Sequence, residues 1–330
     1  MKSNVFGLSL EPPTNPNIFS IAKIEDKMES MIIDIRDLES VKKVISKVQP
    51  DIIIHMAAQP LVSIGYSDPV TTYSTNVMGT VNILEAIRNT NSVHSFLNVT
   101  TDKVYKNNEW YWGYREDDPL NGFDPYSNSK SCSELVTSCY INSYFDKKVP
   151  ISTARAGNVI GGGDFSDNRI IPDCVRAAIA EKTMVLYNPF STRPYQHVLE
   201  PLFAYLLIVA KQYEDHSYSD TYNVGPDDSS TINNEELVKL FKINWGPNFN
   251  YTMPSSKKNY HEANLLKLDC SKIKSTLGWK PILSITEAIS KTVEWYKVWY
   301  EGKNCIKVMD KQIKDYCNDF INACKGYDGQ

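Results

Sequence analysis

The chain has 330 residues, with 35 Lys and Arg against 39 Asp and Glu, which gives a formal net charge of −4. This length predicts about two domains, or one large α/β unit with an added lobe. A groove for nucleic acid normally shows as a basic excess, so we expect no nucleic-acid partner. No apolar run approaches the roughly 20 residues that span a bilayer, and we expect neither a membrane span nor a signal peptide.

The seven cysteines are odd in number, and none of them stands in a CxxC spacing. This usage is typical of a reduced protein without a structural zinc. We therefore expect a cytoplasmic location and no metal ion.

Short apolar runs alternate with longer helical patterns through the first half of the chain. Asp-Pro pairs at 68–69 and 124–125 supply the N-cap and the first-turn proline of two helices. Because strands that alternate with helices need crossover connections, we predict an α/β fold with a Rossmann-like, doubly wound parallel sheet. We expect strands at 4–8, 31–33, 51–57, 95–100 and 151–156, and helices at 38–48, about 69–90 and about 125–145.

The alternation loosens after about residue 160. Residues 161–172 are rich in Gly and Asp, residues 189–201 are rich in Pro, and residues 303–330 have an amphipathic helical pattern. We predict a sheet domain at 1–160, and at 161–330 mainly a smaller C-terminal α/β lobe that binds the substrate.

Candidate ligand-binding residues follow the predicted strands. In an open parallel sheet, ligands bind at the carboxyl ends of the strands. Small residues, which let a ligand approach the backbone, alternate there with polar and ionisable ones. These residues are Asp34, Ile35, Ala57, Ala58, Gln59, Thr101, Asp102, Lys103, Arg155 and Asn158.

The sharpest candidate for catalysis is the pair Tyr126 and Lys130. Residues at i and i+4 share a helix face, so an ammonium one turn away would lower the pKa of the phenol. Such a tyrosine can accept a proton from a sugar hydroxyl while hydride leaves the same carbon. The YxxxK spacing also arises often by chance. Thr101 favours the catalytic interpretation, because its hydroxyl can bond the same substrate oxygen.

Asp102 and Lys103 place an acid beside a base at the mouth of the sheet. This pairing suits an elimination, in which one group protonates a departing hydroxyl and the other helps to remove a carbon-bound proton. An Asp-Lys pair is usually a solvated turn, and only its position after a strand favours catalysis.

Three arginines and two histidines are weaker candidates. Arg155, Arg169 and Arg193 can bind a pyrophosphate, because a guanidinium matches phosphate oxygens in fork geometry. Most arginines are surface residues, so composition alone does not decide whether any of these three binds a ligand. His197 and His261 can hydrogen-bond a ligand, although a lone histidine is more often structural.

Taken in order, these residues resemble the extended short-chain dehydrogenase/reductase family and, within it, the CDP-glucose 4,6-dehydratases. The resemblance covers nearly the whole chain. Lys103 belongs to it, because the dTDP-glucose dehydratases carry glutamate at that place. Its specific segments include LEPPTNPNIF, QPDIIIHMAAQPLV, NVTTDKVY, WGYRE, DPYSNSK, RAGNVIGGGDF and RPYQHVLEP.

The resemblance implies an NAD-dependent enzyme that converts CDP-glucose to CDP-4-dehydro-6-deoxyglucose, a precursor of deoxysugars in surface polysaccharide. Tyr126, tuned by Lys130 and aided by Thr101, would take the proton of the 4-hydroxyl while hydride passes to NAD. Asp102 would protonate the hydroxyl that leaves C6, and hydride would return to C6. Lys103 is the counterpart of the family's carboxylate base.

The resemblance also implies ligand-binding positions and a homodimer. Family members pair through two long helices, which correspond to 69–90 and 125–145. The residues expected to line the cofactor are Asp34, Ile35, Ala57, Ala58, Gln59, Asn76, Tyr126 and Lys130. The residues expected to face the nucleotide sugar are Asn158, Arg169, Arg193, Gln196 and His261.

The beginning of the chain departs from the family. It has no GxxGxxG loop, and VFGLSLEPP corresponds to the family's second strand. The first strand lies in the middle of the 3-2-1-4-5-6 order, so we expect an N-terminally incomplete sheet in which nothing bridges the two halves. The helix N-terminus that would hold the NAD pyrophosphate is missing with it. The glycines at 161–163 follow the wrong strand to replace it.

Three hypotheses follow. The first is a CDP-glucose 4,6-dehydratase whose recorded start lies downstream of the true one, or which was truncated. The second is another nucleotide-sugar epimerase or dehydratase on the same scaffold. The third is a non-catalytic remnant that only pairs with subunits.

Overall fold

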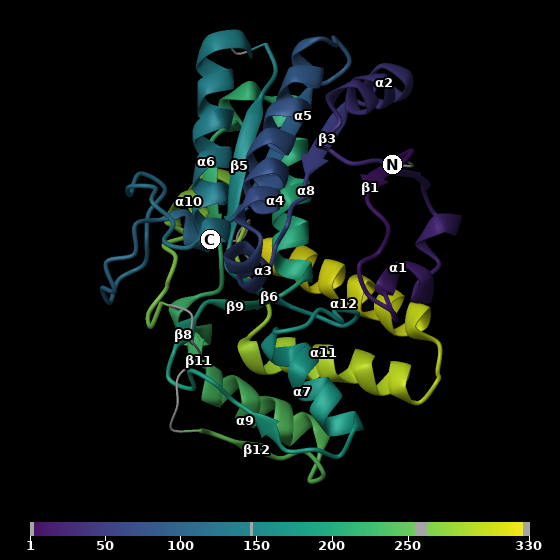
Figure 1. Ribbon diagram of the computed structural model, residues 1–330, viewed down its shortest axis with the longest axis vertical. Helices are drawn as coiled ribbons and strands as arrows, with labels where there is room; N and C mark the ends of the chain where they lie inside the picture. Colours follow the sequence, from purple (N-terminus) through teal and green to yellow (C-terminus); the bar gives the residue numbers. More distant parts are fainter. Residues whose placement is uncertain (1–2, 146–147, 255–262, 326–330) are drawn as a thin grey trace.

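The computed structural model describes residues 3–145, 148–254 and 263–325. Figure 1 shows a sheet domain above a helical lobe, with the C-terminal helix crossing between them. The lobe contains α7 (Ile170–Ile179), α9 (Asn234–Trp245) and α11 (Ile285–Tyr300), and the crossing helix is α12 (Cys305–Lys325). Within the described residues, no helix combines the length and apolar character needed to cross a membrane.

The central sheet has four parallel strands in the order β10-β5-β4-β3. They are β3 (Ile52–His55), β4 (Ser95–Thr101), β5 (Ile151–Ala156) and β10 (Thr221–Val224). The first three lie where the sequence predicts strands, which confirms the parallel α/β fold. β10 comes from the second half of the chain, so both halves contribute to one sheet.

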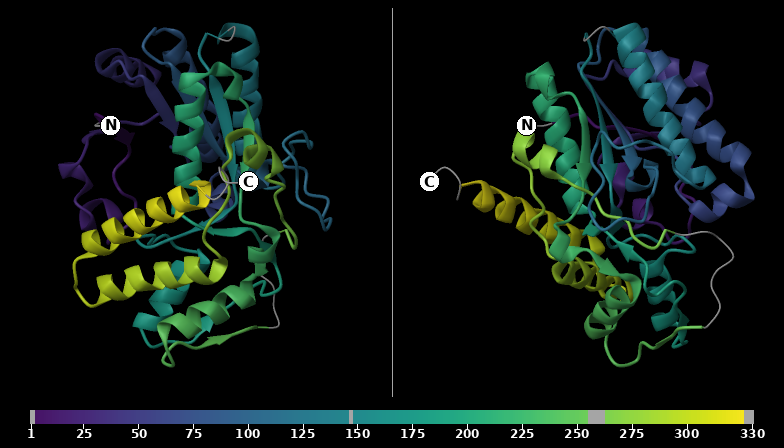
Figure 2. Two further views of the ribbon diagram at one scale, coloured as in Figure 1. Left: turned by 180° about the vertical axis from the view of Figure 1, so that it is seen from behind. Right: turned by 90° about the vertical axis from the view of Figure 1, so that its left-hand side faces the viewer.

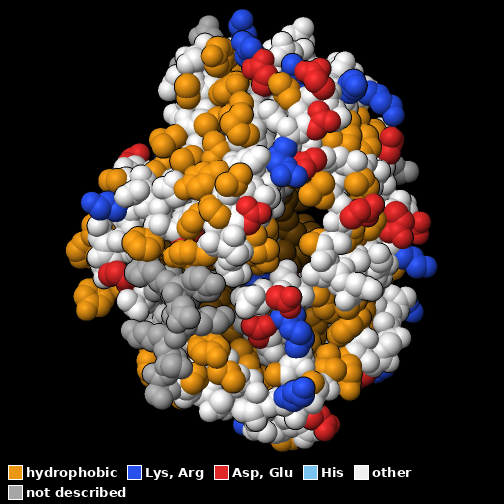
Figure 3. All heavy atoms as spheres, in the orientation of Figure 1, with side chains coloured by type: hydrophobic (Ala, Val, Ile, Leu, Met, Phe, Trp, Pro, Cys, Tyr) orange, Lys and Arg blue, Asp and Glu red, His pale blue; other side chains and the backbone are white. Residues whose placement is uncertain are grey.

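A separate pair of parallel strands, β1 (Phe6–Ser9) and β2 (Glu29–Ile32), does not join the central sheet. This confirms the expected break, because no described strand bridges β1 and β3. Figure 3 shows a hollow between the N-terminal segment and the sheet domain, with hydrophobic side chains around it. Phe6 and Ile52, on the two facing strands, are exposed.

Helices cover both faces of the central sheet (Figures 1 and 2). Side chains alternate between the faces of a strand, and Phe96 therefore packs toward one set of helices while its neighbour Leu97 packs toward the other. On the side of Phe96 are α2 (Leu38–Val48), α5 (Gly79–Arg88) and α6 (Pro125–Tyr140), and on the side of Leu97 is α8 (Leu199–Glu214).

Aspartates start three of the predicted helices, two of them at the predicted Asp-Pro pairs. Asp37 caps α2, Asp68 caps α4 (Pro69–Tyr73) and Asp124 caps α6, each by accepting a backbone N–H three residues on. The helix expected at 69–90 is α4, a π-helical turn η2 (Ser74–Met78) and α5 in succession. The helix expected at 125–145 is α6 followed by a second π-helical turn, η4 (Ile141–Phe145).

The remaining elements are short. Three two-stranded ladders pair β6 with β9, β7 with β12 and β8 with β11. Their strands are β6 (Asn158–Ile160), β7 (Met184–Val185), β8 (Thr192–Arg193), β9 (Tyr195–His197), β11 (Ile232–Asn233) and β12 (Tyr251–Thr252). The short helices are α1 (Ile18–Ile21), η1 (Ile24–Asp26), α3 (Val62–Ser67), η3 (Asp102–Val104), η5 (His216–Tyr218), η6 (Asp228–Ser230) and α10 (Ser271–Leu277).

The lobe has its own apolar core. Phe241 of α9 and Trp295 of α11 are buried there together with Ile171 and Val175 of α7. Ile21 of α1 packs against the same core, so the N-terminal segment reaches from β1 to the lobe. The edge of the central sheet between these parts holds the candidate site.

Candidate active site

The carboxyl end of β4 places Thr101, Asp102 and Lys103 in succession. Asp102 is completely buried, and its Oδ1 accepts hydrogen bonds from Thr101 Oγ1 and Lys103 Nζ, both at 2.9 Å. Its Oδ2 has no described partner. A buried carboxylate oxygen without a donor is costly unless a ligand completes it. Lys103 Nζ also donates to Asn158 Oδ1 at 2.9 Å, so it links the ends of β4 and β6.

Tyr126 and Lys130 lie on the first turns of α6, one turn apart, as the spacing predicts. Burial raises the pKa of Tyr126 to about 12, and a hydrogen bond with Thr101 opposes that rise. The expected lowering of the pKa of Tyr126 by Lys130 is therefore wrong for this structure. The physical reason is that desolvation of the phenolate outweighs the favourable contacts.

Lys130 is itself buried. Burial lowers the pKa of its ammonium to about 8, while the Glu134 carboxylate raises it. Nζ donates to the carbonyl oxygen of Val99 in β4 at 3.0 Å. This bond fixes the lysine against the sheet, behind the tyrosine.

Residues expected at the cofactor lie beyond the ends of β2 and β3. Gln59 and Asn76 are joined, because the Gln59 N–H donates to Asn76 Oδ1 and Asn76 Nδ2 donates to the Gln59 carbonyl. Ala57 and Ala58 are partly exposed beside them. Asp34 forms a bidentate ion pair with Arg36, whose guanidinium donates two hydrogen bonds to the carboxylate. Ile35 is buried, and its side chain fills the space that Gly79 of α5 leaves by having no Cβ.

Residues expected at the nucleotide sugar come from β6, β8, β9 and neighbouring loops. Gln196 is buried, with Nε2 bonded to the Val224 carbonyl and Oε1 without a described partner. Arg169 pairs with Asp164 at 2.9 Å, and its charge also lowers the pKa of Tyr126. Arg193 is buried, and its guanidinium donates to the carbonyls of Thr192 and Ala263. His261 lies outside the described residues.

Arg155 does not present its guanidinium to a ligand, which corrects the pyrophosphate candidate. It is buried, makes a bidentate ion pair with Glu134, and donates to Tyr105 Oη at 2.8 Å. His197 is also buried, and burial lowers its pKa to about 4. Nδ1 accepts from the Leu199 N–H at 3.3 Å, and Nε2 has no described partner.

Sequence reasoning missed Glu134 and Ser129. Ser129 Oγ accepts a hydrogen bond from Asn76 at 2.9 Å, which ties α6 to the cofactor side of the site. Glu134 follows Lys130 by four residues, so it continues the face of Tyr126 and Lys130. That spacing is the signal that could have identified it.

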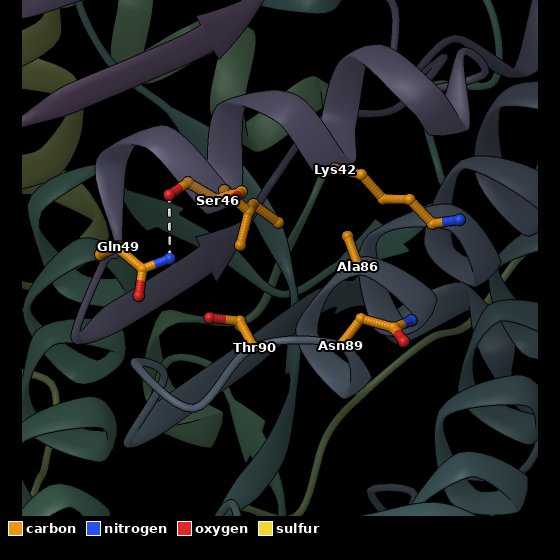
Figure 4. Close-up of a pocket in the computed structure, with 7 residues that line it drawn as sticks. Lys42, Ser46, Gln49, Ala86, Asn89 and Thr90 are labelled. Atoms are coloured by element: carbon orange, nitrogen blue, oxygen red, sulfur yellow. Dashed lines mark hydrogen bonds between the residues drawn. The ribbon is translucent and has the colours of Figure 1, made fainter.

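Another surface pocket lies between α2 and α5 (Figure 4). It is at the edge where strands begin, opposite the site, because α2 and α5 end just before β3 and β4. Gln49 and Asn89 donate their amides to oxygens of their own helices. The described residues contain no group of three or more His, Cys, Asp or Glu side chains arranged to bind a metal ion.

Comparisons with known proteins show the family of the chain. A family model described as GDP-mannose 4,6 dehydratase matches residues 14–292. The CDP-glucose 4,6-dehydratase of Salmonella typhimurium is 43% identical over 323 residues, which cover 96% of this chain and 90% of that protein. The chain belongs to the nucleotide-sugar 4,6-dehydratase family. Family membership confirms the resemblance read from the sequence and makes the protein a hydro-lyase.

More distant relatives and solved structures share the fold. The dTDP-glucose 4,6-dehydratase of Xanthomonas campestris strain ATCC 33913 is 26% identical over 309 residues, with 87% of this chain and 85% of that protein covered. The crystal structure of a dTDP-glucose 4,6-dehydratase from Streptomyces venezuelae with NAD bound superposes with a TM-score of 0.78 at 23% identity, covering 92% and 90% of the two chains. A UDP-glucuronic acid 4-epimerase from Bacillus cereus has a TM-score of 0.77 at 18% identity, covering 90% and 92%.

Proposed function

We propose that the protein is a CDP-glucose 4,6-dehydratase that forms CDP-4-dehydro-6-deoxy-D-glucose and water, with NAD as its retained cofactor. The observation that carries this is the buried Asp102, whose Oδ2 has no described partner and whose neighbour Thr101 bonds Tyr126. A 4-epimerase removes no hydroxyl group and needs no such acid. The 43% identical relative supports CDP-glucose as the substrate.

The first half of the reaction needs a base at the 4-hydroxyl. Tyr126 takes this proton, and Thr101 bonds the same oxygen and orients it. Burial holds the phenol protonated in the structure described, because the pKa of Tyr126 is about 12. Positive charge beside the phenol must therefore increase when the reactants bind. Arg169 already supplies part of it.

The second half removes water across C5 and C6. Asp102 gives a proton to the departing 6-hydroxyl from its unpartnered oxygen, since its other oxygen is held by Thr101 and Lys103. Lys103, which is partly exposed, lies between Asp102 and Asn158. Its ammonium first passes a proton to Asp102, so that the neutral amine takes the C5 proton while Asp102 protonates the departing hydroxyl and the ion pair is restored.

The described residues fit the nicotinamide and adenine ends of NAD. Bound NAD supplies a hydride acceptor, later a hydride donor, and the positive charge of its oxidised ring. Tyr126, Lys130 and the Gln59–Asn76 pair would hold its nicotinamide side, and Ala57 and Ala58 leave room beside them. Asp34 and Ile35 would border the adenine. Among the described residues, no glycine-rich turn opens a helix between β1 and β3 to receive the pyrophosphate.

The nucleotide sugar would lie between the sheet edge and the lobe. Gln196 Oε1 is the buried acceptor still without a described partner on that side. Asn158, Arg169, Arg193 and His261 are the other residues we propose to face it. In this arrangement residues 1–160 mainly bind the cofactor and residues 161–330 mainly bind CDP-glucose.

The proposed function is tested by incubating the protein with NAD and CDP-glucose. We expect loss of the hexose and appearance of an alkali-sensitive 4-keto sugar whose mass is lower by one water. dTDP-glucose, UDP-glucose and GDP-mannose serve as competing substrates. A C4-inverted hexose of unchanged mass would identify an epimerase instead. An unaltered CDP-glucose would exclude the dehydratase proposal.

We further propose a homodimer through the faces of α4, α5 and α6 that point away from the sheet. These helices lie together on one flank of the molecule (Figure 2). α6 buries mainly small polar side chains toward β4, whereas its Leu135 is 58% exposed. Val70 of α4 is 79% exposed, and Met78 of η2 is also exposed. Apolar side chains gathered on one surface mark an interaction site.

The substitution Leu135→Glu tests this surface. A charge in the middle of an apolar interface leaves an unpaired buried group in the dimer, so we expect monomers. Ile243→Glu on α9 is the matched control, because Ile243 is 77% exposed on the lobe. Light scattering after size-exclusion chromatography measures the mass of both. A dimer that persists in the Leu135 variant, or a wild-type monomer, would contradict the proposal.

We place the reaction in the cytoplasm. The six described cysteines are free, which suits a reducing compartment. The product would serve as a precursor of deoxysugars in surface polysaccharide, including the O antigen of lipopolysaccharide.

A further inference from the structure

A buried polar network joins α6 to the sheet directly behind the candidate site. Asn98 and Thr100 alternate on β4 with residues that face the other way, so both point toward α6. Asn98 Nδ2 donates to Ser133 Oγ at 3.1 Å, and Thr100 Oγ1 donates to Glu134 Oε1 at 2.6 Å. Together with the bond from Lys130 to the Val99 carbonyl, these contacts attach α6 to three consecutive residues of β4.

Glu134 is the acidic member of this network. It is buried, and both of its oxygens accept from Arg155 Nε at 2.9 Å. Arg155 stands opposite Thr100 in the register of β5 and β4. The carboxylate of one helix residue is thereby held by two adjacent strands, and it cannot move without breaking both contacts.

Arg155 is anchored on its far side as well. Its Nη1 donates to Tyr105 Oη and to the Glu116 carbonyl, each at 2.8 Å, and its guanidinium lies 4.8 Å from the centre of the Tyr105 ring. The ion pair is therefore part of a rigid buried assembly. A buried ion pair adds little net stability, because desolvation of the two charges offsets their attraction. A contribution to stability therefore does not explain why the Glu134–Arg155 pair lies here.

The explanation lies in the spacing along α6. Glu134 follows Lys130 by one turn, and Lys130 follows Tyr126 by one turn. We infer that Glu134, held by Arg155 and Thr100, is a positioning residue that sets α6 against the end of β4 and keeps Lys130 an ammonium behind Tyr126. This inference rests on the proposed roles of Tyr126 and Lys130.

The charges around Lys130 agree with this role. The Glu134 carboxylate raises the pKa of Lys130, against the lowering by burial. His55 of β3 is the titratable group on the neighbouring strand, and burial and Lys130 lower its pKa to about 3, so it is neutral at the pH of turnover. Tyr126 lies on the same helix, and the charge of Asp102 at the end of β4 raises the pKa of Tyr126. Glu134 is thus the negative charge that sustains the ammonium.

The first test is the pH dependence of turnover in Glu134→Gln. Without the carboxylate, Lys130 loses its proton at lower pH. In the pH profile of kcat, we expect the fall at high pH, the basic limb, to begin about one pH unit lower than in the wild type. At pH values above this fall, kcat should be about tenfold below that of the wild type, and the KM for CDP-glucose should stay within threefold of the wild-type value. Glu134→Asp keeps the charge and should keep the limb in place. Glu116→Gln is the matched control, because its carboxylate caps Asn223 N–H at the sheet edge.

Folding of the variants is controlled separately. Glu134→Gln leaves Arg155 buried without its partner, so the double variant Glu134→Gln/Arg155→Met removes both charges. A purely structural role predicts that the double variant recovers the wild-type limb. Our inference predicts that the limb stays shifted, and recovery would overturn it, as would a Glu134→Gln profile that superposes on the wild type.

A readout without turnover separates this inference from the proposed function. The ¹³Cε resonance of Lys130, assigned by its loss in Lys130→Arg, reports the titration of its amine. We expect it to titrate at lower pH in Glu134→Gln than in the wild type and in Glu116→Gln. Equal titration would overturn the inference. If CDP-glucose is not consumed but this shift is observed, the proposed function fails and the role of Glu134 stands.

Discussion

Replacing Tyr126 with Phe should reduce kcat for CDP-glucose about a thousandfold, within the range of positioned proton-transfer groups and equivalent to about 4 kcal/mol of transition-state stabilisation. The phenol of Tyr126 is hydrogen-bonded to Thr101 at the sheet edge. Without its oxygen, the variant lacks the base that the proposed mechanism assigns to the 4-hydroxyl proton. The substrate should still bind, because the ring and the nucleotide contacts remain.

Single-turnover measurement with NAD identifies the step that is lost. We expect the absorbance of reduced NAD not to appear in the Tyr126 variant, because hydride leaves only when the hydroxyl loses its proton. Tyr144→Phe is a matched control, since Tyr144 is exposed on η4. Turnover of the Tyr126 variant within threefold of wild type would remove the basis of the proposed mechanism.

Replacing Asp102 with Asn should separate oxidation from water loss. Asn has nearly the same shape, and its oxygen can still accept from Thr101 and Lys103. It cannot deliver a carboxylic proton to the departing hydroxyl, so we expect kcat to fall at least about a hundredfold. The first hydride transfer should persist, since Tyr126 and Lys130 are unchanged.

Two measurements follow the steps of the Asp102 variant. Reduction of NAD reports the first step, and release of ¹⁸O from C6 of labelled substrate reports the second. We expect the first to remain within about tenfold of wild type and the second to be lost. Asp118→Asn in an exposed turn is the control. If both steps were lost together, Asp102 would position the reacting groups rather than act as the acid. If both steps were fully retained, Asp102 would have no part in the reaction.

Much of the sheet domain was predictable, because its signals are local. The Asp-Pro pair at 124–125 starts α6 at the expected residue, and the apolar runs of β3, β4 and β5 need only their own composition. The break between β1 and β3 was also predictable, since it follows from the order of strands rather than from side-chain packing. The spacing of Tyr126 and Lys130 fixed their common helix face.

The sequence by itself therefore determined the parallel α/β fold, the caps at the two Asp-Pro pairs, the family and the group of residues at one sheet edge. The tertiary structure decided what each ionisable group does there. It half-buries Tyr126, so that desolvation raises the pKa of the phenol, and it turns Arg155 toward Glu134 instead of a ligand. The reason is that desolvation and pairing depend on side chains from strands and helices far apart in the chain, and no local pattern records which of them meet.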